Sequence, residues 1–464
     1  PGISVKLSAL HPRYELAQKG RVMDELLPRL ESLAVQAARH DIGFNIDAEE
    51  ADRLDLSLDL IEAVAANPAL GGWKGFGIVV QAYQKRAPFV IDWLEELARR
   101  RGRRLMIRLV KGAYWDSEIK RAQELGLDGY PVFTRKPSTD ASYLACARKL
   151  LHKEAIFFPQ FATHNAHTIA AVLEFAGNTR AFEFQRLHGM GEVLYQEIVE
   201  SDRFGVGCRI YAPVGQHEDL LAYLVRRLLE NGANSSFVNR LQDDRLPIDE
   251  IIEDPIGRAR SYAGRPHPKI PAPRHILMPE RVAARGLDLT APGVLAELRQ
   301  RMLDSDRQDH HAGPIVGGAA ATNDLRPVHA PADRERVVGQ TRDATPDEID
   351  RALTLARHAA PAWAARPVDE RAACLERAAD LMEERLPELM ALCTREAGKT
   401  LADGVAEVRE AVDFCRYYAA RARADMARPL PLRGPHAGRT LALFRYSPTA
   451  SETTPEMLLP VLLA

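Results

Sequence analysis

Seven short runs rich in β-branched and aromatic residues recur along the first part of the chain, and each is followed by a stretch with helical periodicity. The runs are ISVKLSAL (3–10), GFNIDAEE (43–50), GFGIVVQAY (75–83), LMIRLVKGAY (105–114), FFPQFATH (157–164), AFEFQRLHG (181–189) and CRIYAPVG (208–215). Intervening segments such as ADRLDLSLDLIEAVAAN have the 3.6-residue period of amphipathic helices. Strands that alternate with helices predict a parallel sheet covered by helices.

Polar or ionisable residues stand at the ends of several of these strands, namely Asp47, Gln81, Lys111, His164 and His188. In a (β/α)8 barrel the carboxyl ends of the strands form the active face. We therefore predict an α/β fold of this barrel type. An open doubly wound sheet is the alternative, but it does not usually place a polar group at nearly every strand end. Seven strands are one fewer than eight, and we expect the first barrel strand to have been lost by truncation at the N-terminal side.

Composition and charge restrict the class of protein. The 464 residues are 46% apolar and 27% charged, which predicts globular cores and room for two to four domains of about 100–200 residues each. A net charge of −2 without a long basic tract argues against nucleic acid as a partner. No apolar run approaches the ~20 residues of a membrane span, and PGISVKLSAL lacks the pattern of a secretory signal. Five scattered cysteines predict reduced, mostly packed thiols in a cytosolic protein.

The segment 220–231, LLAYLVRRLLEN, follows the seventh strand and is predicted to be a helix. Tyr223, Arg226, Arg227 and Glu230 are spaced at i, i+3, i+4 and i+7, so they share one face of that helix. Two adjacent guanidinium groups can hold a planar carboxylate, with the aromatic ring against its apolar part. A solvated arginine pair bound to Glu230 is the alternative, but the position after seven strand-like runs favours a ligand site.

A family resemblance extends over about residues 1–265. The motifs KLSALHPRYE, NIDAEEADRLDLSLDL, IRLVKGAYWDSEIK, FATHNAHT, FEFQRLHGMGE, RIYAPVG and YLVRRLLENGANSSFVN resemble the proline dehydrogenase domain of the bacterial bifunctional proline-utilisation flavoenzymes, the PutA family. The resemblance implies a distorted (β/α)8 barrel whose first strand precedes the KLSAL strand, in agreement with the strand count. It also implies FAD on the carboxyl face and oxidation of L-proline to 1-pyrroline-5-carboxylate.

The substrate residues follow from this resemblance. Arg226 and Arg227 would bind the carboxylate of proline together with Lys6, and the empty site would be electropositive. Asp47 and Glu230 would offset part of that charge. Side chains around the proline ring would exclude water. The implied catalytic residues are Lys6, Asp47, Arg108, Tyr211, Tyr223, Arg226 and Arg227, and Leu187 joins Tyr211 and Tyr223 in the wall around the ring.

The cofactor residues are also implied by the resemblance. A buried cation without a partner is costly, and the reduced flavin ring offers negative charge to Arg108. Arg108 and Gln81 would lie beside that ring and tune its potential. The segment 133–139 would bind the pyrophosphate through a hydroxyl and two cations. The expected FAD contacts are Asp47, Ala48, Val79, Gln81, Arg108, Val110, Gly112, Ala113, Tyr114, Trp115, Thr134, Arg135, Lys136, Thr163, His164, Asn165 and Glu230.

The two histidines at strand ends, His164 and His188, are weaker indicators of a functional site. A lone strand-end histidine such as His164 is more often a satisfied structural residue, although the resemblance places the THN segment beside the flavin. His188 has the weaker claim to a role there. Neither histidine has metal-ligand spacing to other histidines, cysteines or carboxylates, so no metal site is predicted.

The remaining chain changes character. Residues 266–325 are rich in proline, glycine and alanine and predict a linker with one helix near 292–303. Three long helices are expected at 345–365, 367–397 and 401–426, the first opened by a capping box of Thr345 and Glu348.

Residues 326–428 resemble the N-terminal helices of aldehyde dehydrogenases, and 429–464 form an unassigned tail. In the PutA family this second domain oxidises glutamate semialdehyde with NAD. Its nucleotide-binding strands, nucleophilic cysteine loop and general base have no counterpart here, which suggests a truncated or frameshifted gene.

Three functions are considered. The sequence favours an FAD-dependent proline dehydrogenase. The absent nucleophilic cysteine loop and nucleotide-binding strands argue against an NAD-dependent aldehyde dehydrogenase, and an inactive fragment unable to hold flavin is the third alternative. The resemblance further implies a membrane quinone as electron acceptor, peripheral association of a cytoplasmic protein with the inner membrane, and a homo-oligomeric parent protein with NAD confined to its second domain.

Overall fold

The computed structural model describes residues 1–200, 204–216, 252–305 and 310–427, together with isolated positions between 218 and 250 and two short strands at 430–431 and 440–441. The chain divides into two compact units. The first comprises Pro1–Ala122 and Gly129–Pro271, and the second comprises Gln123–Asp128 and Ala272–Ala464.

The first unit is built on a seven-stranded sheet whose spatial order follows the chain order. Its strands are β1 (Gly2–Val5), β2 (Gly43–Ile46), β3 (Phe76–Gln81), β4 (Leu105–Val110), β5 (Phe157–Ala162), β6 (Glu183–Leu187) and β7 (Gly207–Tyr211). Every neighbouring pair is parallel. The predicted α/β class is therefore confirmed, and so are the seven predicted strands. The edge strands of this sheet are β1 and β7, between which the missing strand was expected.

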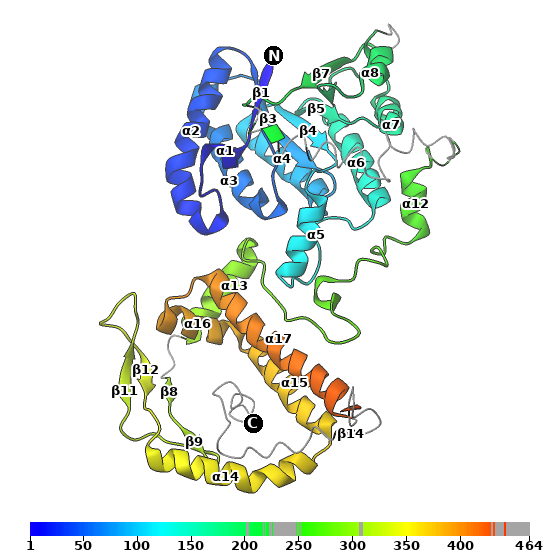
Figure 1. Ribbon diagram of the computed structural model, residues 1–464. Helices are drawn as coiled ribbons and strands as arrows, with labels where there is room; N and C mark the ends of the chain where they lie inside the picture. Colours follow the sequence, from blue (N-terminus) through cyan, green and yellow to red (C-terminus); the bar gives the residue numbers. More distant parts are fainter. Residues whose placement is uncertain are drawn as a thin grey trace. The chain divides into compact units, whose positions relative to one another are not determined.

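Helices surround the strands of this unit (Figure 1). They are α1 (Leu7–Leu10), η1 (Leu16–Gln18), α2 (Lys19–Arg39), η2 (Ala51–Arg53), α3 (Leu54–Ala66), η3 (Pro68–Leu70), α4 (Ala87–Arg101), α5 (Trp115–Glu124), α6 (Lys136–Leu151), α7 (Ala166–Ala176), α8 (Glu192–Val199) and α12 (Pro255–Ser261). One boundary differs from expectation, because the first strand ends at Val5 and LSAL forms α1. A four-residue apolar segment fits either period, so the sequence pattern could not separate the two.

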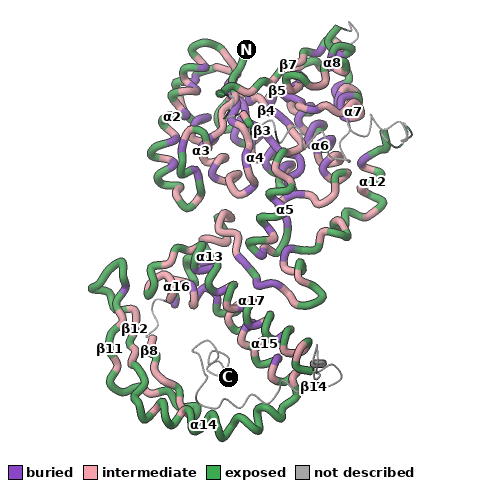
Figure 2. The backbone as a smooth tube through the Cα atoms, in the orientation of Figure 1, coloured by how far each residue is buried: buried purple, intermediate pink, exposed green. Residues whose placement is uncertain are grey.

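The core of the first unit lies between the sheet and its helices. All six residues of β3 are buried, as expected for a parallel strand covered on both faces. Helix α2 buries Val22, Leu26, Leu30 and Ala34 along one stripe, which is the amphipathic pattern that its sequence predicts. Figure 2 shows this buried region around the strands and along the inner sides of the helices.

The described part of the second unit contains five longer helices. They are α13 (Pro292–Ser305), α14 (Pro346–Ala365), α15 (Val368–Glu384), α16 (Leu386–Ala397) and α17 (Leu401–Met426). The short elements are η4 (Pro273–His275), β8 (His311–Ala312), β9 (Ile315–Val316), β10 (Ala319–Ala320), β11 (Arg326–His329), β12 (Val337–Thr341), β13 (Leu430–Pro431) and β14 (Thr440–Leu441). None of the helices in the described ranges combines the length and hydrophobicity needed to cross a membrane.

Two expectations for this unit need correction. The helix expected over 367–397 is interrupted at Arg385, because Pro387 lies in the first turn of α16 and disfavours a continuous helix. The segment expected as a linker packs into the second unit, where Ala284 and Leu298 share a core with Met390. The capping box of Thr345 and Glu348 at the start of α14 is present as predicted.

Helix α14 lacks buried residues, and its tube is exposed along most of its length in Figure 2. Ile349 and Leu353 are each about half exposed, and Trp363 is also exposed. The amphipathic pattern of this helix therefore has no covering partner within the described part of the chain.

Candidate active site

Arg108 occupies the centre of the site. It is the fourth residue of β4 and is only 8% exposed. Its Nη1 donates to Asp47 Oδ1 at 2.8 Å, its Nη2 to Ser4 Oγ at 2.7 Å and its Nε to Gln185 Oε1 at 2.7 Å. The three acceptors come from β1, from the residue after β2 and from β6, so the sheet curls around this guanidinium.

Tyr211 closes the cluster from β7. Its ring centroid lies 5.0 Å from Arg108 Cζ, and its hydroxyl donates to Asp47 Oδ2 at 3.2 Å. The Asp47 carboxylate therefore binds Arg108 with one oxygen and Tyr211 with the other. Burial raises the pKa of Asp47, and the Arg108 charge and the Tyr211 hydrogen bond oppose that rise.

Lys6 and Tyr114 form a second contact at the strand ends. Lys6 follows β1, and its Nζ donates to the Tyr114 hydroxyl at 3.3 Å. The same nitrogen lies 6.0 Å from the Tyr114 ring centroid. The Lys6 charge also acts on the Asp47 carboxylate, where it opposes the rise in pKa. Lys6 and the Arg108 cluster therefore belong to one electrostatic site.

Gln81 is held at the end of β3. Its Nε2 donates to the backbone oxygen of Glu49 at 2.8 Å, while Glu49 itself accepts from Ser8 N at 3.0 Å and from Arg53 Nη1 at 2.9 Å. Val79 is buried on the same strand, and Ala48 and Val110 are half-buried at neighbouring strand ends. These contacts fix the loop that carries Asp47.

Gly112 follows β4 in a conformation that requires glycine. Its φ is +132°, and an added Cβ would lie 2.4 Å from the Tyr83 ring. Ala113 is exposed and Tyr114 is half-buried. Trp115 Nε1 donates to the backbone oxygen of Phe133 at 2.8 Å, which ties the turn to the start of the 133–139 segment. The turn can thus bring bare backbone to a ligand.

The predicted pyrophosphate residues gather at the N-terminus of α6. Thr134 Oγ1 accepts from His267 N at 3.0 Å, and Arg135 Nε donates to the backbone oxygen of Arg265 at 3.0 Å. Lys136 Nζ donates to Asp140 Oδ2 at 2.8 Å, and Lys111 also binds that carboxylate. These interactions with residues 265–267 were not expected from sequence.

The charge of Asp140 is supported by its neighbours. Burial alone would raise the pKa of Asp140, but the charges of Lys111 and Lys136 outweigh burial and lower that pKa. The Asp140 carboxylate thus binds the ammonium groups of both Lys111 and Lys136, which leaves an excess of positive charge beside α6. This positive charge can bind an anion.

The THN segment has clear structural roles. His164 Nε2 accepts from Leu187 N at 3.1 Å, so the ring supports the end of β6. Thr163 Oγ1 accepts from Asn165 N at 3.1 Å, and Asn165 Oδ1 caps α7 by accepting from Thr168 N at 3.1 Å. The structural role considered for His164 is thus observed, and a flavin contact by this segment stays a prediction.

The structure brings together five of the predicted residues, namely Lys6, Asp47, Arg108, Tyr114 and Tyr211. The predicted arginine pair and its neighbours, Tyr223, Arg226, Arg227 and Glu230, lie outside the described residues. Within the described ranges there is also no cluster of three histidine, cysteine or acidic side chains arranged to hold a metal ion.

Sequence reasoning missed a polar network in the interior of the curled sheet. Glu183 binds Gln160, Gln185 and Arg209, and Gln160 in turn accepts from Asn45. Asn45 and Gln160 each interrupt an otherwise apolar strand, and Glu183 and Gln185 flank Phe184 on β6, which is the signal that could have revealed them. Because buried polar groups need partners, such residues on neighbouring strands are expected to meet.

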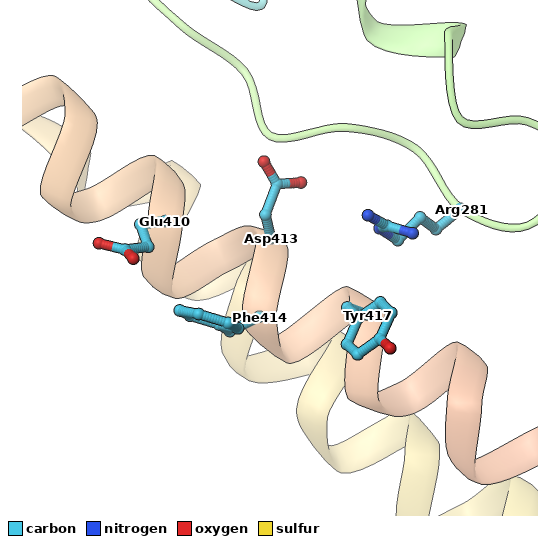
Figure 3. A pocket seen from close by; sticks show the side chains of 5 residues that line it. All are labelled: Arg281, Glu410, Asp413, Phe414 and Tyr417. Carbon is cyan, nitrogen blue, oxygen red and sulfur yellow. The ribbon is translucent and has the colours of Figure 1, made fainter.

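The second unit has a shallow pocket of a different kind, lined by Arg281, Glu410, Asp413, Phe414 and Tyr417. Figure 3 shows Arg281 opposite four residues that α17 supplies. Arg281 Cζ lies 5.2 Å from the Tyr417 ring centroid, and Asp413 Oδ1 accepts from Ala284 N at 2.9 Å. These contacts hold segment 281–284 on α17, and the pocket contains no predicted site residue.

The first unit is thus an α/β half-barrel with a buried cation–carboxylate cluster at the carboxyl ends of its strands, the arrangement of a barrel enzyme. The chain belongs to the proline dehydrogenase family, whose profile matches residues 1–240. The aldehyde dehydrogenase family profile matches residues 319–450 and so continues beyond residue 428, where the resemblance was expected to end.

Relatives match both parts at once. The chain is 56% identical over 437 residues to the bifunctional protein PutA of Klebsiella aerogenes, covering 92% of this chain and 33% of the relative. It is 51% identical over 437 residues to that of Rhizobium meliloti, covering 93% of this chain and 35% of the relative. The chain therefore spans about a third of the length of these curated relatives.

Solved structures agree with this similarity. A mutant of Bradyrhizobium japonicum proline utilization A matches with a TM-score of 0.83 and 50% identity, covering 94% of this chain and 41% of that chain. The Bdellovibrio bacteriovorus protein inactivated by N-propargylglycine matches with a TM-score of 0.83 and 30% identity, covering 93% of this chain and 44% of that chain.

Proposed function

We propose that the first unit oxidises L-proline to 1-pyrroline-5-carboxylate with FAD as its cofactor. The observation that carries this proposal is the buried cluster of Arg108, Asp47 and Tyr211 at the strand ends of a proline dehydrogenase family chain. Asp47, Ser4 and Gln185 each take one N–H of the Arg108 guanidinium, and a guanidinium has five N–H donors, so Arg108 can also donate to an acceptor-rich ligand. FAD would accept the hydride equivalent that leaves the proline ring carbon next to nitrogen.

The donor set of this chain fits FAD. Lys6 and Arg108 supply positive charge at the strand ends, while Arg135 and Lys136 supply it beside α6. A flavin ring presents acceptors and gains negative charge on reduction, and a pyrophosphate is anionic, so both parts match these donors. Arg108 and Gln81 would hold the ring, and Thr134, Arg135 and Lys136 the pyrophosphate. The other FAD contacts expected from the sequence, such as Val79, Gly112 and Tyr114, would complete the cofactor site.

The chain's own residues would bind and orient proline. Lys6, joined by Arg226 and Arg227, would bind its carboxylate, and a paired guanidinium fork fixes the plane of such a group. Tyr211, Tyr223 and Leu187 would pack against the ring and exclude water. Asp47 would act by holding both Arg108 and Tyr211 in place, because its two oxygens bind one residue each.

Purification of the 464-residue chain tests this function. We expect flavin absorbance in the purified protein and reduction of an artificial acceptor dye on addition of L-proline. D-Proline is the matched control, because it carries the same groups with the carboxylate misplaced. A chain that folds but carries no flavin after incubation with FAD would contradict the proposal and support the inactive-fragment alternative.

The path of the electrons beyond FAD is part of the same proposal. We expect a membrane quinone as acceptor, with peripheral association of a cytoplasmic protein with the inner membrane and a homo-oligomeric full-length protein. Proline-dependent reduction of a short-chain ubiquinone would support the quinone, and failure to reduce it while a dye is reduced would contradict it. NAD reduction with glutamate semialdehyde is not expected from this chain.

A further inference from the structure

Glu183 anchors the polar network beneath Arg108. Its Oε1 accepts from Gln160 Nε2 at 2.8 Å, from Gln185 Nε2 at 2.9 Å and from Arg209 Nε at 2.8 Å. Its Oε2 accepts from Arg209 Nη2 at 2.8 Å. The carboxylate is therefore held by a two-point ion pair with Arg209 and by two amides, which fixes its position.

Gln185 connects this anchor to Arg108. Its Nε2 donates to Glu183, and its Oε1 accepts from Arg108 Nε at 2.7 Å. An ionised carboxylate can only accept, so Glu183 forces the amide nitrogen of Gln185 toward itself. The amide oxygen must then face Arg108. Gln185 is only 2% exposed, so water does not compete for either contact.

We infer that Gln185, oriented by the Glu183–Arg209 ion pair, is a positioning residue that fixes the Arg108 guanidinium for its contact with the flavin. The flavin part of this inference rests on the proposed function. Asp47 and Ser4 hold the two terminal nitrogens of Arg108, and Gln185 holds the third corner at Nε. Three fixed corners set both the place and the plane of the guanidinium.

Gln185→Met removes the third corner while keeping a side chain of similar length. The guanidinium is then held only by Asp47 and Ser4 at its two terminal nitrogens, so it can tilt about the line that joins them and its charge is no longer aimed at one place. A positioned cation favours the more negative, reduced flavin, so loss of position should lower the midpoint potential. A tenfold fall in the equilibrium ratio of reduced to oxidised flavin corresponds to about 30 mV for a two-electron couple.

Gln160 provides a matched control. It is also 2% exposed and also donates to Glu183 Oε1, but it makes no hydrogen bond to Arg108 among those seen in the described chain. Gln160→Met therefore removes an equivalent buried amide from the same carboxylate. If the network only stabilises the fold, the two variants should shift melting temperature alike and leave the flavin potential unchanged.

The test measures the flavin midpoint potential by reductive titration without proline, together with a crystal structure of each variant. In Gln185→Met we expect a midpoint potential that is lower by the equivalent of a tenfold fall in the ratio of reduced to oxidised flavin, together with a displaced Arg108 guanidinium. We expect neither change in Gln160→Met. An unmoved guanidinium with an unchanged potential would overturn the inference, as would equal shifts in both variants.

Two further arms keep the result decisive. Gln185→Asn retains a buried amide but shortens its reach, so it replaces Gln185→Met if that variant does not fold and should shift the potential in the same direction. The position of Arg108 can be read from crystals with or without flavin. A protein that binds no flavin would refute the proposed function, while the geometry of Arg108 would still decide the role of Gln185.

Discussion

Replacing Arg108 by methionine should strongly destabilise the first unit. The change leaves Asp47 Oδ1, Ser4 Oγ and Gln185 Oε1 without the donor that now serves them. Removal of one partner from a buried ion pair costs about 3–5 kcal/mol, because the remaining charge stays desolvated. At about 2–4 °C per kcal/mol for a unit of this size, the melting temperature should fall by roughly 6–20 °C.

The loss should depend on pH in a defined direction. Burial already raises the pKa of Asp47, and Arg108 opposes that rise, so the pKa climbs further when Arg108 is absent. The folded variant then holds a proton that the unfolded chain releases near its ordinary value of about 3.9. The destabilisation is complete above the folded pKa and diminishes as pH falls through it. The double variant Arg108→Met/Asp47→Asn should recover much of the loss at pH 8.

Urea unfolding followed by tryptophan fluorescence provides the assay, since Trp73, Trp93 and Trp115 all belong to the first unit. Arg104→Met is the control. Among the described residues, Arg104 donates one hydrogen bond, to the backbone oxygen of Phe157 at 3.2 Å, and its loss should cost about 0.5–1.5 kcal/mol. A loss below about 1 kcal/mol for Arg108→Met at pH 8, or no recovery in the double variant, would refute the reasoning.

Four other outcomes are expected. Gly112→Ala should lower the free energy of unfolding by about 1–3 kcal/mol and reduce flavin content, because φ is +132° and Tyr83 occupies the Cβ position. Gly72→Ala is the control, since its Cβ would meet free space, and thermal unfolding should show little change. Arg226→Met and Arg227→Met should each raise KM for proline and cost on the order of 2–4 kcal/mol in kcat/KM with flavin retained; unchanged steady-state kinetics would exclude both from the site. The Arg342 hydrogen bond lowers the pKa of Glu348 to about 2. This pair therefore stabilises α14 fully above the ordinary pKa of 4.5, and its contribution is lost as pH falls toward 2. Circular dichroism should show a steeper acid loss of helix for the parent chain than for Glu348→Gln. Leu353→Lys with Trp363→Lys should reduce self-association in sedimentation velocity, because both side chains belong to the exposed apolar residues of α14, and equal association of variant and parent would exclude this face.

The sequence predicted the strands well and the interior contacts poorly. Each strand lies in a short run that contains β-branched or aromatic residues and stands between helical patterns, so β1 to β7 could be placed without tertiary information. The break between α15 and α16 depends on Pro387, which the helical period over 367–397 conceals. Family resemblance selected Asp47, Arg108 and Tyr211, and the structure brings these three together. Their roles toward substrate and cofactor stay predictions.

The interior network escaped because its members are distant in sequence. Gln185 lies 77 residues from Arg108, and Gln160 lies 115 residues from Asn45. Periodicity describes neighbours along the chain and contains no information on which inward side chains will meet. A polar residue at an inward position indicates only that some partner is required.

The reach of Arg108 also has a consequence for the order in which the first unit folds. Its partners lie 61, 77 and 104 residues away along the chain. Contacts of such sequence separation form slowly, because the loop entropy must be lost before they stabilise anything. Until β1 and β6 have both joined the sheet, the guanidinium keeps its hydration, since drying it without partners is unfavourable. Arg108 should therefore contribute little in the folding transition state, and its replacement should mainly accelerate unfolding while leaving the refolding rate nearly unchanged.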